Sequence, residues 1–269
     1  MMRKTTQMFV TTLFALAILA QVRTASAAGV LDEYFSSEEF PVEVSADVGI
    51  YDKYIWRGFR LDGDKSIQPA INLSVGPFEG GFWGNFDMQS NDTLDAAEVD
   101  GWFGIAFDLG IIDESLEIVG VSFGNTWYNF PDGDTGLAEG SHAEELYLGI
   151  SVDTFLSPSF TWYHDYSDEA SGGADGNYFV FSIGHSFTLD EETGISLDIG
   201  EELGFNDEAF IMGDGGWSTT TLGLTIPLTD TVSVSPMVAV TVPFGDLEDA
   251  NDGNQDDEFW GGVAMSFAN

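Results

Sequence analysis

The segment AEVDGWFGIAFDL, residues 97–109, alternates apolar and polar side chains over most of its length. Ala97, Val99 and Phe103 fall on one side of an extended chain, and Glu98 and Asp100 fall on the other. A period of two is typical of a β-strand with one apolar and one polar face. The segment is longer than the ~5–6 residues of an average soluble strand and could cross a bilayer when tilted.

The same alternation recurs along the chain, and no segment of useful length has the 3.6-residue period of an amphipathic helix. In the fifth such segment, Val119, Val121 and Phe123 lie on the opposite parity to Leu116 and Ile118. We predict twelve strands, at residues 44–57, 66–76, 80–89, 97–109, 116–130, 143–155, 158–167, 177–187, 194–205, 217–228, 231–243 and 257–268.

The connections between these strands alternate between two kinds. Short, turn-like connections occupy residues 76–79, 110–115, 156–157, 188–193 and 229–230. Longer, acidic and Gly-rich connections occupy residues 58–65, 90–96, 131–142, 168–176, 206–216 and 244–256. This alternation favours an all-β fold, a single up-and-down antiparallel transmembrane β-barrel of about twelve strands, residues 44–269, with short periplasmic turns and long extracellular loops.

Aromatic residues gather near the ends of the predicted strands. In a membrane barrel such residues form girdles at the two lipid–water interfaces. We therefore assign to the girdles Tyr54, Trp56, Phe59, Phe107, Trp127, Phe130, Phe155, Phe187, Phe205 and Phe244.

The first 27 residues have the parts of a secretory signal peptide. Arg3 and Lys4 precede an apolar stretch at residues 8–20, and Ala25-Ser26-Ala27 supplies a small-residue cleavage site. We expect cleavage after Ala27 and export to the bacterial outer membrane. Residues 28–43 are acidic and aperiodic, and we interpret them as a periplasmic N-terminal arm.

The charge balance limits the partners of the protein. The chain has 7 Lys and Arg against 46 Asp and Glu, a formal net charge of -39. Three of the cations lie in residues 1–27, which leaves four against 46 acids in the exported chain. Such a chain cannot neutralise phosphates, so nucleic acid is excluded as a partner. Its 43% hydrophobic residues also exclude an acidic disordered tail.

Several short motifs carry a resemblance to a known family. They are Ser45-Ala46-Asp47-Val48, Tyr54-Ile55-Trp56-Arg57-Gly58, Ser66-Ile67-Gln68-Pro69-Ala70, Gly80-Gly81-Phe82-Trp83-Gly84-Asn85 and Glu98-Val99-Asp100. In these motifs the segment from Val44 to Phe107 resembles the TorF-type porins, also catalogued as the gcw_chp family of proteobacterial outer-membrane proteins. The resemblance implies an outer-membrane barrel with a pore and brings no defined substrate and no catalytic residues.

The end of the chain departs from the usual pattern of outer-membrane barrels. Such barrels commonly end on an aromatic residue that helps the assembly machinery to recognise the last strand, but here Ala268 and Asn269 follow Phe267. The alternation that leads to Phe267 is intact, so we still expect outer-membrane lipid and the assembly machinery to be partners of this chain.

The polar faces of the strands would line a lumen. As pore-lining residues we predict Lys53, Arg57, Asp87, Glu98, Asp100 and Glu145. All four cations that follow residue 27 lie between Lys53 and Lys65, so we expect a basic spot facing acids across the lumen. This arrangement predicts a porin-like channel for passive diffusion of ions or small solutes, biased towards cations.

Three alternatives remain open from the sequence. Arg57 could pair with Glu98 or Asp100 and plug a structural or adhesive barrel. A secreted soluble β-sandwich could bind glycans through Trp83, Trp102 or Trp162. An enzyme is not expected, because Ser141-His142 and His164-Asp165 make no set of nucleophile, base and orienting residue.

The acidic connections could bind cations loosely. Residues 132–134, 246–249 and 252–258 offer carboxylate oxygens suited to Ca²⁺ or Mg²⁺. None fits the spacing of an EF-hand, so solvated loops are the favoured interpretation and no cofactor is expected.

Overall fold

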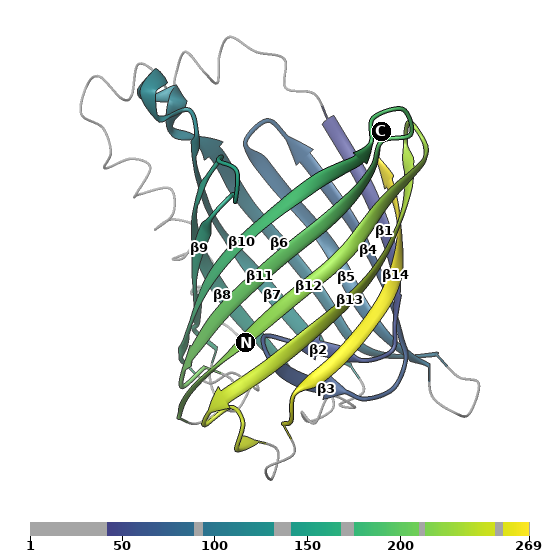
Figure 1. The fold of residues 1–269 in the computed structure, drawn as a ribbon. Helices are drawn as coiled ribbons and strands as arrows, with labels where there is room; N and C mark the ends of the chain where they lie inside the picture. The colour runs from purple at the N-terminus through teal and green to yellow at the C-terminus, as the bar shows by residue number, and fades with distance from the viewer. Residues whose placement is uncertain are drawn as a thin grey trace.

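The computed structural model describes residues 42–88, 94–131, 141–167, 175–209, 213–250 and 255–268. In this part of the chain, twelve antiparallel strands close into one barrel (Figure 1). The prediction of a twelve-stranded up-and-down barrel is therefore confirmed. None of the helices formed by these residues has the length and apolar character needed to span a membrane.

The barrel strands are β1 and β4–β14, and a separate two-stranded sheet is made of β2 and β3. The elements are β1 (Val42–Tyr51), β2 (Tyr54–Trp56), β3 (Phe59–Asp62), β4 (Ser66–Val75), β5 (Phe78–Met88), β6 (Leu94–Asp108), the 3₁₀ turns η1 (Leu109–Ile111) and η2 (Glu114–Leu116), β7 (Val119–Phe130), β8 (Ser141–Val152), β9 (Ser159–Asp165), β10 (Asn177–Asp190), β11 (Ile195–Asp207), β12 (Asp214–Thr229), β13 (Val232–Gly245) and β14 (Glu258–Ala268).

Pairing of the first strand with the last closes the barrel. One edge of β1 pairs with β4, and its other edge pairs with β14, where Asp47 lies opposite Ser266. Each remaining strand pairs with its neighbour in sequence. Closure satisfies the backbone hydrogen bonds of every strand edge, which a β-structure in lipid requires.

The two ends of the barrel differ as the connection lengths predict. At one end, here called the turn end, the connections are residues 76–77, 109–118, 153–158, 191–194 and 230–231, and β1 begins and β14 ends there. Most of the longer connections lie at the opposite end, the loop end, which is the lower end in Figure 1; residues 109–118 at the turn end are an exception.

The parity break in the fifth predicted strand has a local cause. The structure begins β7 at Val119, so Leu116 and Ile118 lie outside the strand. The preceding residues form η1 and η2, and Asp113 caps η2 by accepting hydrogen bonds from the backbone N–H and the hydroxyl of Ser115. These hydrogen bonds to Ser115 lower the pKa of Asp113, because they favour its ionised form.

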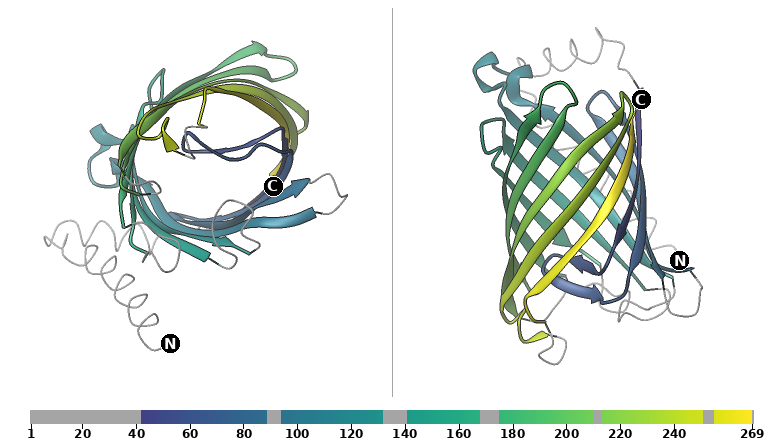
Figure 2. Two further views of the ribbon diagram at one scale, coloured as in Figure 1. Left: turned by 90° about the horizontal axis from the view of Figure 1, so that it is seen from below. Right: turned by 45° about the vertical axis from the view of Figure 1, so that its right-hand side comes forward.

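The first predicted strand, residues 44–57, is wrong beyond Tyr51. The Asp52 carboxylate accepts a hydrogen bond from the Gly261 N–H at 2.8 Å, and the Asp52 N–H donates to the Gly261 carbonyl at 3.0 Å. The chain then leaves the wall and forms the β2–β3 hairpin, which lies inside the barrel at its loop end (Figure 2). Trp56 pairs with Phe59 across a two-residue turn of Arg57 and Gly58, both with positive φ.

The outer wall is apolar. Large apolar side chains at every second position are exposed on it, among them Phe82, Phe103, Leu148, Phe181, Ile199, Leu222, Val240 and Met265. One exception is Glu201, whose carboxylate accepts hydrogen bonds from Ser218 and Thr220 on the same outer face. The inner wall carries the polar positions of the strands, many of them buried.

The aromatic girdles are partly as predicted. Phe205 and Phe244 meet at the loop end with ring centroids 5.9 Å apart, and Phe155 lies 6.3 Å from Phe187 at the turn end. The assignment is wrong for Tyr54, Trp56 and Phe59, which belong to the inner hairpin, and for Phe130, which is buried on the inner wall. Strand-end aromatics near an inward-folded loop can face the lumen as well as lipid.

The closed seam predicts a specific disulfide. Directly opposed residues of antiparallel strands have Cα atoms ~4.5–5.5 Å apart, within the range of a disulfide. We expect the double variant Asp47→Cys/Ser266→Cys, in a chain that has no other Cys, to form a cross-link between β1 and β14 that changes its mobility on a denaturing gel.

The matched control moves one cysteine by one inward-facing position. Ala264 lies opposite Gly49, so Asp47→Cys/Ala264→Cys should stay largely reduced under the same oxidation. Equal cross-linking of both pairs would contradict the register.

Candidate functional site

The β2–β3 hairpin is attached to the last strand at its base. The Lys53 ammonium lies 2.5 Å from Glu258, and the Arg60 guanidinium lies 2.6 Å from the other oxygen of the same carboxylate. The backbone N–H of Arg60 also donates to the side chain of Gln255. Glu258 is buried, so two partly exposed cations neutralise one buried acid where β14 begins.

The middle of the hairpin contacts the wall between β5 and β6. The Tyr54 hydroxyl donates to Glu98 at 2.8 Å, and its ring lies 5.5 Å from that of Trp83. Burial, and then the charge of Glu98, raise the pKa of Tyr54 well above its ordinary value. Asp100 lies two residues along β6 from Glu98, and its Oδ1 is buried without a hydrogen-bond partner.

The tip of the hairpin places Arg57 against β8. Its guanidinium makes a two-point contact with Glu145, at 2.7 and 2.9 Å. The Tyr128 hydroxyl donates to the same carboxylate at 2.9 Å. Burial, the largest single effect, lowers the pKa of Arg57, but Glu145, Tyr128 and Tyr163 together raise it more, so the pKa lies well above its ordinary value and the guanidinium stays charged.

Aromatic rings surround the same guanidinium. Its central carbon lies 4.0 Å from the ring centre of Tyr163, 4.4 Å from that of Tyr178 and 4.6 Å from that of Trp56. A desolvated cation over an aromatic face gains about 2 kcal/mol or more, which adds to the hydrogen bonds with Glu145. Three of the four aromatic residues, Tyr128, Tyr163 and Tyr178, belong to the wall strands β7, β9 and β10.

These contacts hold Arg57 in an unusual backbone conformation. Its φ is 45°, in the left-handed region that costs a non-glycine residue about 1–2 kcal/mol. Charge-assisted hydrogen bonds contribute ~1.5–3 kcal/mol each, so the contacts with Glu145 outweigh this cost.

The next residue, Gly58, packs against Trp217. Its φ is 80°, and a Cβ on it would lie 2.3 Å from the Cβ of Trp217. Trp217 in turn lies flat over Gly204 and donates from its indole N–H to Glu202 at 2.7 Å. A buried apolar cluster surrounds this contact and joins the hairpin to the far wall; it consists of Tyr178, Val180, Ala209, Trp217 and Leu247, with Trp56, Phe59 and Tyr163 packed against it.

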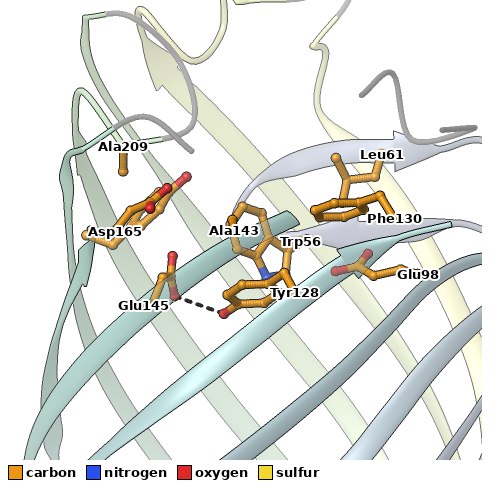
Figure 3. Close-up of a pocket in the computed structure, with 10 residues that line it drawn as sticks. Trp56, Leu61, Glu98, Tyr128, Phe130, Ala143, Glu145, Asp165 and Ala209 are labelled. Atoms are coloured by element: carbon orange, nitrogen blue, oxygen red, sulfur yellow. Dashed lines mark hydrogen bonds between the residues drawn. The ribbon is translucent and has the colours of Figure 1, made fainter. Parts of the chain in front are cut away.

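Two cavities differ greatly in size along the lumen. Between the hairpin and the wall a space of about 20 Å³, enough for about one water molecule, is lined by Trp56, Glu98, Tyr128, Glu145 and Asp165 among others (Figure 3). Towards the turn end a chamber of about 370 Å³ is lined mostly by small residues of β6–β9, including Gly120, Ser122, Gly149, Ser151 and Thr161. The space beside the hairpin is thus far smaller than the chamber nearer the turn end.

The structure brings together most of the predicted pore-lining residues. Asp87, Glu98, Asp100 and Glu145 lie buried on the inner wall, whereas Lys53 and Arg57 lie on the inserted segment and not on a wall strand. The cations contact acids directly rather than facing them across the lumen, and Arg57 pairs with Glu145 rather than with Glu98 or Asp100.

Sequence reasoning missed several residues of the site: Tyr128, Tyr163, Tyr178, Trp217 and Glu258. One available signal was the Arg57-Gly58 pair between the aromatic runs Tyr54-Ile55-Trp56 and Phe59. A glycine in the second position of a two-residue connection indicates a tight hairpin.

Other candidate chemistry from the sequence is not assembled in the described residues. No group of three or more His, Asp or Glu in this part of the chain is placed to hold a metal ion. Of the acidic segments, residues 132–134 and 252–254 lie outside the described residues. His164 stacks on Trp162 on the outer face of β9 and contacts the Gly176 carbonyl.

Comparison with known proteins gives a family and a fold. The model of the family described as "Bacterial protein of unknown function (Gcw_chp)" matches residues 36–240. No curated protein matches the sequence.

Among solved structures, the chain is similar to the NanC porin, with a TM-score of 0.52 and 10% identity over 82% of this chain and 98% of that one. It is also similar to the KdgM porin, with a TM-score of 0.51 and 10% identity over 84% and 98% of the two chains. The COG4313 outer membrane channel from Pseudomonas putida F1 has a TM-score of 0.50 and 12% identity over 87% and 98%. At such identities the similarity concerns the fold.

The Arg57–Glu145 contact predicts how well the hairpin resists protease. After residue 27 every Lys and Arg lies between Lys53 and Lys65, so trypsin can cut the exported chain only there. Removing one partner of a buried ion pair costs ~3–5 kcal/mol. We therefore expect Glu145→Gln to speed cleavage after Arg57 by about 100-fold or more, as followed by mass spectrometry of the folded barrel.

Asp198→Asn is the matched control for this experiment. Asp198 is an inner-wall carboxylate bound by Ser186 and Thr225, so its substitution should leave cleavage after Arg57 unchanged. Equal rates for wild type and Glu145→Gln would mean that the ion pair does not hold the hairpin.

Proposed function

The chain belongs to the Gcw_chp family of bacterial proteins of unknown function, and we propose that it is a porin-like outer-membrane channel for ions or small solutes. One observation carries the proposal: a closed barrel with an apolar outer wall holds an inner chamber and an inserted hairpin that packs against acidic residues of the wall. Size and charge beside that hairpin would decide which solutes pass.

The proposed location rests on the outer wall and on the start of the chain. Exposed Phe, Leu, Ile and Val side chains on the outer face suit a hydrocarbon surround. Residues 1–27 would be removed as a signal peptide and residues 28–43 would form a periplasmic arm, with the assembly machinery inserting the barrel. The resemblance of residues 44–107 to TorF-type porins supports the same location.

The proposed passage is biased towards cations. Lys53, Arg57, Asp87, Glu98, Asp100 and Glu145 are the proposed pore-lining residues. The cations Lys53 and Arg57 pair with Glu258 and Glu145, and further carboxyl groups, those of Glu98 and Asp100, lie buried on the same inner wall. A constriction with excess carboxylates attracts cations and repels anions.

The second candidate is a plugged structural or adhesive barrel. The observation in its favour is the small cavity of about 20 Å³ beside the hairpin, which is too narrow for a solute larger than water. In that case the hairpin would serve stability alone.

We propose no catalytic step and no cofactor for this passive role. We also propose that acidic loops such as residues 246–249 bind Ca²⁺ or Mg²⁺ loosely.

The membrane location predicts a face-dependent cost of a charge. An Arg on the lipid face near the midplane costs ~2–4 kcal/mol. We expect Leu222→Arg, at an exposed outward position of β12, to lower the free energy of unfolding in lipid vesicles by about that amount, measured by urea titration. The neighbouring Thr221→Arg, which points into the lumen, should cost far less; the reverse order would contradict the assignment of faces.

The channel proposal predicts conductance that depends on the hairpin. In planar bilayers we expect small discrete steps and a cation-selective reversal potential in a salt gradient. Replacing residues 53–64 with a short Gly-Ser linker should enlarge the steps, and Arg57→Gln should change both step size and selectivity. Val240→Ala, on the outer face, is the matched control and should change neither.

The plugged barrel predicts a different result. Inserted wild-type protein would then be silent, and Arg57→Gln would change stability alone. Silence of both the wild type and the variant without the hairpin, in protein shown to be folded by heat-modifiable mobility, would overturn the channel.

A further inference from the structure

The side chain of Arg57 occupies a complete binding site for a planar cation. The wall supplies a carboxylate from β8 that takes two hydrogen bonds, at 2.7 and 2.9 Å, and aromatic rings from β7, β9 and β10. Two parallel N–H···O bonds and ring faces at 4.0 and 4.4 Å are the contacts that recognise a guanidinium group. These wall residues form a site whether the guanidinium belongs to the chain or to a solute.

Arg57, which fills this site, lies on a segment that could leave the wall without unfolding the barrel. Arg57 sits at the tip of a two-stranded hairpin that is not hydrogen-bonded into the barrel sheet. Its left-handed backbone, φ 45°, belongs to the two-residue turn with Gly58, so release of the side chain from the wall can leave the hairpin itself intact. A competing solute therefore has to replace the contacts of one side chain and the packing of the tip, and the barrel sheet stays intact.

A solute cannot share the site with Arg57. The space beside it is about 20 Å³, the size of about one water molecule. Binding must therefore displace Arg57, and displacement moves the tip of the hairpin away from the wall.

The same region has acceptors beyond those that Arg57 uses. Glu98 and Asp165 line the space next to Glu145, and the Oδ1 atom of Asp100 is buried without a hydrogen-bond partner. Two acids besides Glu145 thus line the small space, and they already accept hydrogen bonds from Tyr54 and from Ser167, so a cationic solute would meet further carboxyl groups there. The excess of acceptors excludes an anionic solute from this position.

From these observations we propose that Arg57 is the built-in occupant of a guanidinium-binding site on the barrel wall. Small solutes that carry a guanidinium group bind Glu145 and the surrounding tyrosines in its place and release the hairpin. The inference rests on the proposed channel function for its consequence, since release would widen the passage for the same solutes. Methylguanidinium is the simplest probe of the site, and methylammonium is its matched control, because it has the same charge without the planar fork.

The first measurement follows whether the hairpin is docked, by chemical labelling, and does not depend on ion current through the barrel. Leu61 lines the small cavity from β3, and the chain has no Cys, so Leu61→Cys provides one labelling position for a polar maleimide. If solute competes with Arg57, the open population rises as 1 + [L]/Kd, about tenfold at a concentration of 10 Kd. We expect faster labelling with methylguanidinium and a much weaker effect of methylammonium at equal ionic strength.

Four variants in the Leu61→Cys background test the site itself. With Glu145→Gln, labelling should be fast without solute and should not respond to it, whereas Asp198→Asn should respond like the parent. With Arg57→Gln the site is vacated, and calorimetry should detect methylguanidinium binding that Arg57→Gln/Glu145→Gln loses. No binding to Arg57→Gln, or binding that does not need Glu145, would overturn the proposal.

The two proposals fail in distinguishable ways. A protein that conducts small cations, but whose labelling and conductance ignore methylguanidinium, would retain the channel and overturn the site. A protein whose labelling responds to methylguanidinium without any current would retain the site and overturn the channel.

Discussion

The ion pair between Arg57 and Glu145 is the contact on which the interior of this barrel depends. Twelve strands enclose more space than their own side chains fill, and an inserted segment fills part of it. That segment is polar at its base and strained at its tip, so it needs a strong anchor on the far wall. Without Glu145 the buried guanidinium would be an uncompensated charge among aromatic rings. Such a charge strongly destabilises a folded protein.

The fold could be predicted from the sequence almost completely, because its two determinants are local. Strand faces follow from the period of two, as in residues 97–109, and barrel topology follows from the alternation of short and long connections. The predicted strand bounds were wrong where the apolar–polar alternation of the sequence continued beyond the end of a strand of the barrel wall. Residues 54–57 alternate like a strand, but Asp52 pairs with Gly261 and the chain turns inward. At Leu116 the parity changed because two 3₁₀ turns precede β7.

The site could be predicted only in part, because its geometry is set by contacts distant in sequence. The inward position of Asp87, Glu98, Asp100 and Glu145 follows from strand parity alone. The choice of Glu145 over Glu98 as the partner of Arg57 depends on where a hairpin tip reaches across the lumen, which no spacing along the chain encodes. The tyrosines around the guanidinium look like ordinary alternating residues in three separate strands until the barrel closes.

Attachment of the hairpin to both ends of the chain bears on the order in which the protein assembles. The hairpin follows the first strand, yet Lys53 and Arg60 bind Glu258, the first residue of the last strand. Its docking surface also includes residues from β5 to β12, so this surface is complete only when most of the barrel has formed. Contacts of such sequence separation form late, after loop-closure entropy has been overcome. We therefore expect the hairpin to dock late in assembly, because the ion pairs of Lys53 and Arg60 with Glu258 can form only after the last strand has reached the first.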